Sequence, residues 1–368
     1  MEHIEALSVD IGERPAGSPE EGAAADYARE QFELWGYDVE VQPFTASSEM
    51  LREASVTTAG REIEASPFLN AAAGTVTARL VDAGAGHVGD FPAAASGAVV
   101  LIQRQDVTHS DMARRAEAAG AVGVIVANRE PGRFLGFVDP PTALPMAGID
   151  QAEGESLRSA LAQGPIEVTV TVEPTQDVTS RNVIARPPAE PCRTLSGGHY
   201  DSVPWAAGAI DNASGAATVL ELARAAASAG LSGHCFALFG AEEIGLNGSA
   251  FLIAQLSAAE RAALTTVYNY DVTSGGDAIE LVGSGELIEL ALVAANARGI
   301  GARRSELPEG ANSDHASFIE AGIPALFFTS NDFAPIHTQA DNFANLEPGV
   351  IEPIARLGFA LLLGPAAP

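Results

Sequence analysis

The chain has 368 residues, of which 47% are hydrophobic, and it carries a formal net charge of −28 at pH 7. So strong a negative charge argues against nucleic acid or an anionic membrane as a partner. All 20 basic residues are arginine, since the sequence contains no lysine. This excludes a P-loop lysine, a Schiff-base lysine and a Ser-Lys dyad.

The sequence shows no signal for a membrane. No stretch approaches the roughly 20 apolar residues that a spanning helix needs. The N-terminus lacks a basic region followed by an apolar run, which is the pattern of a secretory signal. We therefore expect a soluble protein, either secreted with its signal removed or cytoplasmic. The sequence leaves its compartment and its oligomeric state open.

The first clear element lies near the N-terminus. Ser18 is placed to cap a helix over residues 19–35, and Glu21 completes a capping box. Residues 37–44 then alternate between apolar and polar side chains, which predicts a strand. We assign residues 1–60 to the N-terminal part of a larger domain.

The middle of the chain, residues 61–175, has a different residue pattern. Short Val/Ile strands alternate with Gly-rich turns, and they predict a small β-rich domain inserted into the larger one. One helix is expected over 110–121, and residues 139–149 form a proline-rich link. His87 and His109 stand alone, and we interpret both as surface residues. This segment offers no catalytic constellation.

Residues 176–368 alternate between strands and helices. Strands are predicted at 181–186, 194–200, 234–241, 266–272, 278–283 and 324–330. Helices are predicted at 213–229, 248–256, 286–297, 315–321 and 348–363. The pattern predicts the α/β class, with a phosphorylase/hydrolase-like mixed sheet and helices on both faces. In such sheets, ligands bind beyond the carboxyl ends of the strands.

Side chains able to bind metal stand at those strand ends or open the next helix. They are His199, Asp201, Asp211, Glu242, Glu243, Asp271 and His337. The two histidines with three of these five carboxylates suit zinc, which takes nitrogen and oxygen ligands at catalytic sites. One carboxylate can bridge two ions roughly 3.5–4 Å apart. We therefore predict a site for a pair of divalent ions.

Glu242 and Glu243 form an adjacent pair at the end of an apolar run, where their charges repel. One acid can bind metal while the other holds a water and moves its proton, and the metal charge relieves the repulsion. Asp201 is placed to accept the second N–H of a metal-bound His199 if the backbone bends. Asp211 opens a predicted helix, whose dipole favours an anion, although a plain helix cap also explains it.

The two cysteines, Cys192 and Cys235, are too few for a disulfide scaffold or a cysteine-based zinc site. Both flank or enter predicted strands, so we interpret them as buried free thiols. A single disulfide between them stays open as the alternative.

Several segments together resemble peptidase family M28, a family of zinc aminopeptidases. They read HYDSVPWAAGAIDNASG, GAEEIGLNGS, YNYD, SDHASF and HTQADN. The resemblance covers about residues 1–60 and 176–368. Residues 61–175 look like the protease-associated (PA) domain that is inserted in many members.

The resemblance implies a set of metal ligands. In such enzymes, the residues that match His199 and Asp271 bind one zinc ion. Those that match Glu243 and His337 bind the other, and the one that matches Asp211 bridges the two. The implied cofactor is therefore two zinc ions, with cobalt or manganese as alternatives.

The resemblance also implies catalytic roles. It makes Glu242 the general base and Asp201 the acid that orients the first histidine. Many relatives carry a tyrosine just before the last metal histidine, where its phenol helps to hold the oxyanion. Here that residue is Ile336, so the oxyanion donor is unassigned. A family stretch that lines the substrate pocket is matched by Ser313, Asp314 and His315.

The implied function is a metal-dependent exopeptidase that acts on peptides, foremost an aminopeptidase. A glutamate-carboxypeptidase-like enzyme is the main alternative, and it would need a cationic patch for which Arg303 and Arg304 are the candidates. A glutaminyl cyclase would use a single zinc ion, and a receptor-like relative would have lost ligands. No G-x-S-x-G elbow points to a serine hydrolase.

Overall fold

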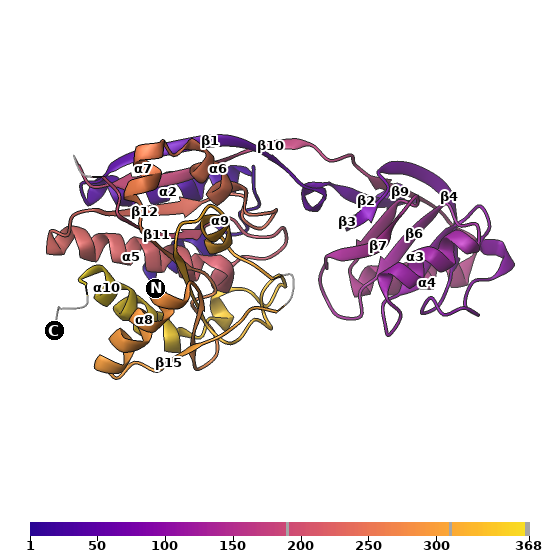
Figure 1. Cartoon of the computed structure of the whole chain (residues 1–368). Coiled ribbons are helices and arrows are strands. Elements are labelled where there is room, and N and C mark those ends of the chain that lie inside the picture. The colour runs from indigo at the N-terminus through magenta and orange to yellow at the C-terminus, as the bar shows by residue number, and fades with distance from the viewer. Residues whose placement is uncertain (189–190, 309–310, 365–368) are drawn as a thin grey trace. The chain divides into compact units, whose positions relative to one another are not determined.

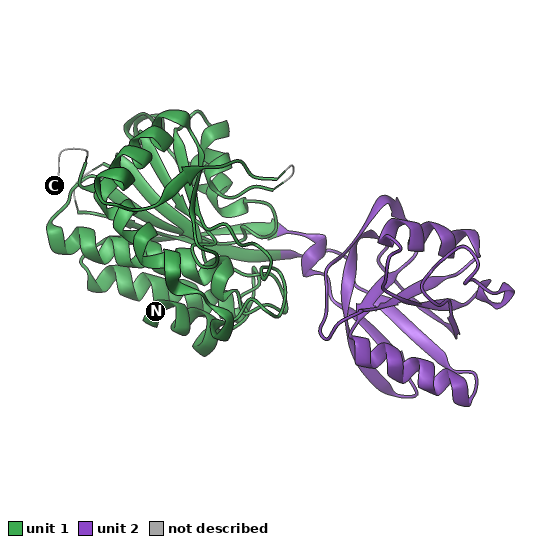
Figure 2. Ribbon diagram, turned by 90° about the horizontal axis from the view of Figure 1, so that it is seen from below, with its two compact units in different colours: residues 1–46, 178–368 green, residues 47–177 purple. Residues whose placement is uncertain are grey.

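The computed structural model describes the whole chain except residues 189–190, 309–310 and 365–368. The chain folds into two compact units (Figure 2). Unit 1 contains residues 1–46 and 178–368, and unit 2 contains residues 47–177. Among the described residues, no helix combines the length and the apolar character needed to cross a membrane.

Unit 1 is built on an eight-stranded mixed sheet in the order β1-β10-β12-β11-β13-β16-β14-β15 (Figure 1). Its strands are β1 (Asp38–Ser47), β10 (Asp177–Arg186), β11 (Thr194–His199), β12 (His234–Phe239), β13 (Thr266–Tyr270), β14 (Ile279–Gly283), β15 (Ala302–Arg304) and β16 (Ala325–Thr329). The central strands β12, β11, β13 and β16 run parallel, whereas β10 and β14 are antiparallel to their neighbours β12 and β16.

Helices cover both faces of this sheet, as predicted. They are α1 (Glu2–Glu5), α2 (Pro19–Leu34), α5 (Ser214–Ala229), α6 (Asn247–Gln255), α7 (Ala258–Ala263), α8 (Gly285–Ala297), α9 (His315–Glu320) and α10 (Ile351–Leu362). Helices α1, α2, α5, α8 and α10 bury their apolar side chains in one core. Helices α6 and α9 pack in a second core on the opposite face, around Phe239 and Phe318. The expected mixed sheet between two helical layers is confirmed.

The structure bears out most of the local signals that predicted these elements, but the capping box is wrong, because Glu21 Oε2 accepts from the N–H of Gly17 and not from that of Ser18. Ser18 caps α2 by accepting a hydrogen bond from the backbone N–H of Glu21 at 3.0 Å. The six strands predicted after residue 176 all form, with ends that differ by a few residues. Helix α5 begins at Ser214, after an irregular turn over Ala209–Ala213 in which Asp211 has non-helical backbone angles, so Asp211 precedes the helix and does not open it. The side-chain oxygen of Asn212 accepts a 2.9 Å hydrogen bond from the N–H of Gly215, at the start of this helix.

Unit 2 is a β-rich domain with two helices. Its strands are β2 (Ala54–Thr58), β3 (Arg61–Ala71), β4 (Gly74–Asp82), β5 (Val99–Gln103), β6 (Gly123–Ala127), β7 (Gly136–Thr142), β8 (Met146–Ile149) and β9 (Glu167–Val172). The sheet closes on itself because β2 pairs with both β9 and β3. Its helices are α3 (His109–Ala118) and α4 (Gln151–Gln163), which pack on separate apolar clusters.

The expected boundary near residue 60 lies too far along the chain. Residues 47–60 belong to unit 2, because β2 forms a hairpin with β3 and also pairs with β9, more than 100 residues later. At the other end, unit 2 ends at Asp177, close to the expected residue 175. The proline-rich link expected at 139–149 contains the end of β7 and all of β8.

Two further expectations are wrong. Cys192 and Cys235 form a disulfide, and they are not free thiols. It ties the segment before β11 to β12, with the two Cα atoms 5.4 Å apart. His109 is only partly exposed, because its ring packs against Phe68 and Phe134 at centroid distances of 5.1 and 5.6 Å.

Candidate metal centre

The parallel strands of unit 1 bring the predicted metal-binding side chains to one edge of the sheet. His199 is the last residue of β11 and lies opposite Phe239, the last residue of β12. Glu242 and Glu243 therefore continue beyond the same edge. Asp271 directly follows β13, which is the other parallel neighbour of β11. This is the edge at which ligands bind in α/β sheets.

Several loops at this edge have an unusual backbone. Ala241, Leu246, Val272 and His337 have φ angles of 53°, 57°, 48° and 58°, in the left-handed region that residues other than glycine rarely adopt. The conformation is least favourable for Val272, because its side chain is β-branched. Such conformations persist only where the surrounding structure imposes them, and they gather at functional sites.

Five of the predicted side chains form two groups that share one member. His199, Asp211 and Asp271 make the first group, and Asp211, Glu243 and His337 make the second. In each group the potential ligand atoms lie within 4.8 Å of one another. We call these five residues the ligand cluster.

Asp211 joins the two groups, because its two carboxylate oxygens face different histidines. Its Oδ1 lies 3.1 Å from Nε2 of His199, and its Oδ2 lies 3.2 Å from Nε2 of His337. Asp271 Oδ1 lies 3.3 Å from the same nitrogen of His199, and Glu243 Oε2 lies 3.0 Å from that of His337. This is the arrangement that a bridging carboxylate requires.

The ligand cluster fits divalent metal ions. Glu243 Oε1 is buried and accepts no hydrogen bond from the described residues. A buried carboxylate oxygen without a partner is costly unless a cation neutralises it. Two imidazoles and three carboxylates are the ligand types that zinc takes at catalytic sites.

The electrostatics of the cluster favour positive charge. Burial alone would lower the pKa of His199, but the surrounding carboxylates, above all Asp271 and Glu242, raise it well above its usual value. Burial also opposes the charged form of His337, yet Glu243 and Asp211 raise its pKa to about 11. Burial and neighbouring acids, including Asp314, raise the pKa of Glu242 well above the usual range. The site therefore favours the binding of cations.

Asp201 contacts the ring of His199 and the backbone of both Glu242 and Glu243. Its Oδ1 lies 3.5 Å from Nδ1 of His199, whose Nδ1 also lies 3.2 Å from the Asp201 backbone carbonyl. The two carboxylate oxygens accept hydrogen bonds from the backbone N–H groups of Glu242 and Glu243, at 3.1 and 3.3 Å. A single buried carboxylate thus fixes the end of β11 against the turn after β12.

The other predicted site residues differ in whether they contact the ligand cluster. Ser313 donates a 2.7 Å hydrogen bond to Asp271 Oδ2, and so contacts a potential ligand directly. Asp314 is fully buried, and burial raises its pKa to about 7. His315 stacks on Phe327. Arg303 lies on β15, is exposed and pairs with Glu280, so the structure does not bring it to the cluster.

Arg14 and Asp341 also shape the site, and sequence reasoning gave them no role. The guanidinium of Arg14 is fully buried and donates to five backbone carbonyls, including those of Tyr200 and Gly208. It thereby joins the segment after His199 to the turn that carries Asp211. Asp341 accepts hydrogen bonds from the N–H groups of Ile210 and Asp211, at 2.6 and 3.1 Å. No local pattern reveals such distant partners.

A cavity of about 380 Å³ opens beside the cluster. It is lined by Asp211, Glu242, Glu243, Gly245, Leu246, Asp271, Val272, Leu307, Ala311, Asn312, Phe327, Phe333, Ile336 and His337. One part of its wall is acidic and the rest is mostly apolar. The cavity can therefore hold a ligand with a positive group and an apolar group.

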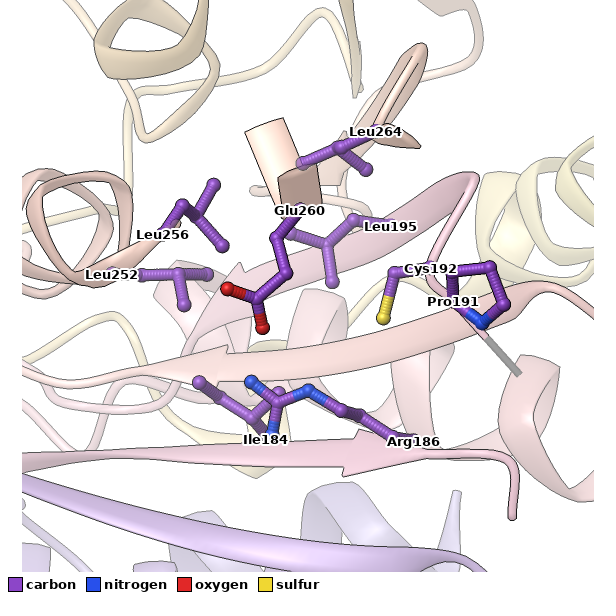
Figure 3. A pocket seen from close by; sticks show the side chains of 9 residues that line it. All are labelled: Ile184, Arg186, Pro191, Cys192, Leu195, Leu252, Leu256, Glu260 and Leu264. Atoms are coloured by element: carbon purple, nitrogen blue, oxygen red, sulfur yellow. The ribbon is translucent and has the colours of Figure 1, made fainter. Parts of the chain in front are cut away.

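A second, smaller cavity of about 140 Å³ lies beside the disulfide, between β10 and helices α6 and α7 (Figure 3). Its wall is mainly leucine and isoleucine, and its two charged side chains already have partners. Arg186 pairs with Glu40, and Glu260 accepts from the N–H and the hydroxyl of Ser257. Its described lining contains no second carboxylate or histidine to form a metal site.

Comparisons with known proteins identify relatives of both units. Residues 182–362 match peptidase family M28, and residues 76–157 match the PA domain. Aminopeptidase YwaD of Bacillus subtilis is 34% identical over 352 residues, which cover 89% of this chain and 74% of that protein. Leucine aminopeptidase 2 of Arthroderma otae is 30% identical over 339 residues, covering 85% and 68%.

The fold also matches solved structures. The structure of BSAP, a zinc aminopeptidase from Bacillus subtilis, superimposes with a TM-score of 0.79 and 29% identity. The match covers 98% of this chain and 92% of that one. Both units thus have counterparts in that structure.

Proposed function

Because the chain belongs to peptidase family M28 and carries a PA domain, we propose that its ligand cluster serves the hydrolysis of the first peptide bond of peptides with a free N-terminus. The relatives named above are aminopeptidases, which supports this activity. The observation that carries the proposal is the pair of histidine–carboxylate groups joined by Asp211.

The two groups suit two zinc ions. One would be held by His199, Asp211 and Asp271, and the other by Asp211, Glu243 and His337. When bound, such a pair of ions polarises the scissile carbonyl and lowers the pKa of the attacking water. The zinc aminopeptidase with the similar fold supports this choice of metal.

Glu242 is the proposed general base. It lines the cavity but belongs to neither metal group, and its Oε2 lies 3.9 Å from Nε2 of His199. Its carboxylate is therefore next to the ligands while remaining free to take a proton. Its backbone is held by Asp201, which restricts the position of the carboxylate.

The reaction then follows from these positions. Glu242 removes one proton from a water as the water oxygen bonds to the carbonyl carbon of the substrate. The carbon–nitrogen bond breaks, and Glu242 returns the proton to the leaving amine. The products are a free amino acid and a peptide shorter by one residue.

The described lining of the cavity contains acidic side chains and no arginine, which favours binding of a free N-terminal ammonium group over a C-terminal carboxylate. Of the four carboxylates on its wall, Glu242 alone belongs to neither metal group, so it can attract a free ammonium group when zinc neutralises the other three. A carboxypeptidase needs the opposite charge. Arg303 and Arg304 cannot supply it from where they lie, because both are exposed on β15 and pair with Glu280 and Glu289.

The apolar part of the cavity supports an apolar N-terminal residue. Leu246, Leu307, Phe327, Phe333 and Ile336 contribute to its wall. Burying an apolar side chain there gains roughly 1.5–3 kcal/mol relative to leaving it in water. We therefore propose that leucine is accepted better than aspartate or glutamate, whose carboxylates would lose their hydration against the apolar wall.

The test uses two copies of one peptide mixture, one free and one N-acetylated, incubated with the zinc-loaded protein. Mass spectrometry of the products should show loss of residues from the free N-termini only, and a chelator should abolish it. Trimming of both copies from the C-terminus would instead indicate a carboxypeptidase. No cleavage of either copy would contradict a peptidase function.

A further inference from the structure

A hydrogen-bond donor that faces the carbonyl oxygen would add to the polarisation that bound zinc supplies, and Ile336 cannot provide one. Negative charge develops on this oxygen as water attacks the carbonyl carbon. A donor that faces it stabilises the transition state more than the ground state. The side chain of Ile336 lines the cavity but carries no polar hydrogen. Another group on the cavity wall can supply this hydrogen bond.

Most of the backbone N–H groups beside the ligand cluster are already paired. The N–H groups of Glu242 and Glu243 donate to Asp201, and that of Asp211 donates to Asp341. The N–H groups of Gly245, Leu246, Asp271 and Val272 donate to Glu242, Glu242, Phe328 and Asn212, respectively. Seven backbone donors on this wall are thus already used inside the protein.

Among the described residues that line the cavity, only two side chains carry a polar hydrogen when the acids are ionised. They are His337 and Asn312. His337 belongs to the ligand cluster, where its Nε2 faces Glu243 and Asp211. Asn312 is exposed, and its side-chain amide makes no hydrogen bond with any described residue. Its two N–H groups are therefore available to a substrate.

The residue after Asn312 fixes it beside the ligand cluster. Ser313 is buried, donates to Asp271 Oδ2 at 2.7 Å and accepts from Asn269 at 2.7 Å. These bonds tie the chain at this point to β13 and to a potential metal ligand. The backbone that carries the Asn312 amide is thus anchored on the first metal group.

We infer that the side-chain amide of Asn312 donates a hydrogen bond to the carbonyl oxygen of the scissile bond and stabilises the oxyanion. In this role Asn312 supplies the hydrogen-bond donor that the side chain of Ile336 lacks. The inference rests on the proposed aminopeptidase function and names one of its catalytic residues. Removing one oxyanion donor typically lowers kcat by about 10²–10³-fold.

The experiment compares the zinc-loaded wild type with Asn312→Ala and Asn312→Asp on leucyl-p-nitroanilide. Both variants should bind zinc as the wild type does. Asn312→Ala should lower kcat by about 10²-fold with KM changed less than about threefold, because the lost bond acts in the transition state. Asn312→Asp should lower kcat further, since its carboxylate repels the oxyanion. The matched control is Asn296→Ala, an exposed asparagine on α8 outside the cavity lining.

A second readout does not depend on turnover. Leucinephosphonic acid presents tetrahedral, negatively charged oxygens, so its affinity should fall at least about tenfold in Asn312→Ala, measured by calorimetry. Rescue is the third arm. Adding Ile336→Tyr to Asn312→Ala supplies a phenol near the same oxygen and should restore at least about tenfold of the lost kcat.

Each outcome decides the inference. A kcat of Asn312→Ala within about threefold of the wild type overturns it, and so does a loss confined to KM or an unchanged affinity for the phosphonate. These results leave the proposed function intact, because the wild type still cleaves the substrate. A wild type that does not release leucine contradicts the proposed function itself.

Discussion

Glu242 and Glu243 are neighbours in the chain, yet they face different partners. Glu243 lies against His337 and belongs to a metal group, whereas Glu242 belongs to neither. Glu242→Gln should therefore keep its zinc and lose about 10²–10⁴-fold in kcat, because the amide cannot accept the proton of water. Zinc content and steady-state kinetics check this, with the exposed Glu289→Gln as the control. Retention of more than about a tenth of the activity would contradict the role of Glu242 as the base.

Arg14 is the clearest case of a residue that supports the site without touching the substrate. Burial lowers its pKa to about 10, so its guanidinium stays charged at neutral pH. Arg14→Met should lower the free energy of unfolding of unit 1 by about 3 kcal/mol, since it removes five hydrogen bonds and leaves the carbonyl of Tyr200 buried without a donor. Urea denaturation measures the loss.

The control for this substitution is Arg29→Met. Arg29 is partly exposed on α2 and pairs with Asp26 and Glu33 on the same helix. Its removal should cost less than about 1 kcal/mol. Equal effects of the two substitutions would contradict a special role for Arg14.

At the scale of elements, the disulfide links two strands that carry the site. Cys192 precedes β11, Cys235 lies in β12, and 43 residues separate them in sequence. For a loop of this length, removing the bond should lower the free energy of unfolding by about 3–4 kcal/mol. Guanidinium unfolding of the wild type should shift with a reductant, and that of a Cys192→Ser, Cys235→Ser double variant should not. A reductant effect of equal size on both proteins would contradict this.

Helix α3 contains a group that makes unit 2 sensitive to acid. Burial, with help from Arg104, lowers the pKa of His109 from 6.5 to about 4. The unfolded chain therefore binds more protons between these values, and the stability that neutral His109 allows is lost as the pH falls from 6.5 to 4. Because the ring is partly exposed, we expect a loss of about 2 kcal/mol.

Thermal unfolding between pH 7 and pH 4 tests this prediction. His109→Phe should flatten the pH dependence relative to the wild type, since the phenyl ring fills the same apolar site between Phe68 and Phe134. His87→Gln is the control, because His87 is an exposed loop residue. A wild type and a His109→Phe variant with parallel pH profiles would contradict the assignment.

For the molecule as a whole, local pattern predicted most elements but not the long-range contacts. The strands that lead to His199 and Asp271 lie where alternating or continuous apolar residues predict them. Such patterns depend only on near neighbours in the chain. The predicted unit boundary is wrong because β2 is assigned to unit 2 by its pairing with β3 and with β9, and β9 lies more than 100 residues later in the chain. The disulfide was missed for the same reason, since the register of β11 and β12 brings its cysteines together.

The site shows the same division. Its metal-binding residue types were visible at strand ends, and strand order explains why they meet. The partners of Arg14 were not visible, because Tyr200 and Gly208 lie 186 and 194 residues away in the chain. Arg303 was considered from sequence alone, and the structure shows it on an edge strand with its own ion-pair partner.

The central claim is that five side chains hold two zinc ions in a centre that releases N-terminal residues. The most direct measurement titrates zinc-free protein with zinc and records, at each step, the ions bound per chain and the rate of leucine release from a leucyl peptide. The account predicts that two ions bind per chain and that full activity requires both. Activity that is complete with one ion per chain, or that persists without zinc, would contradict it.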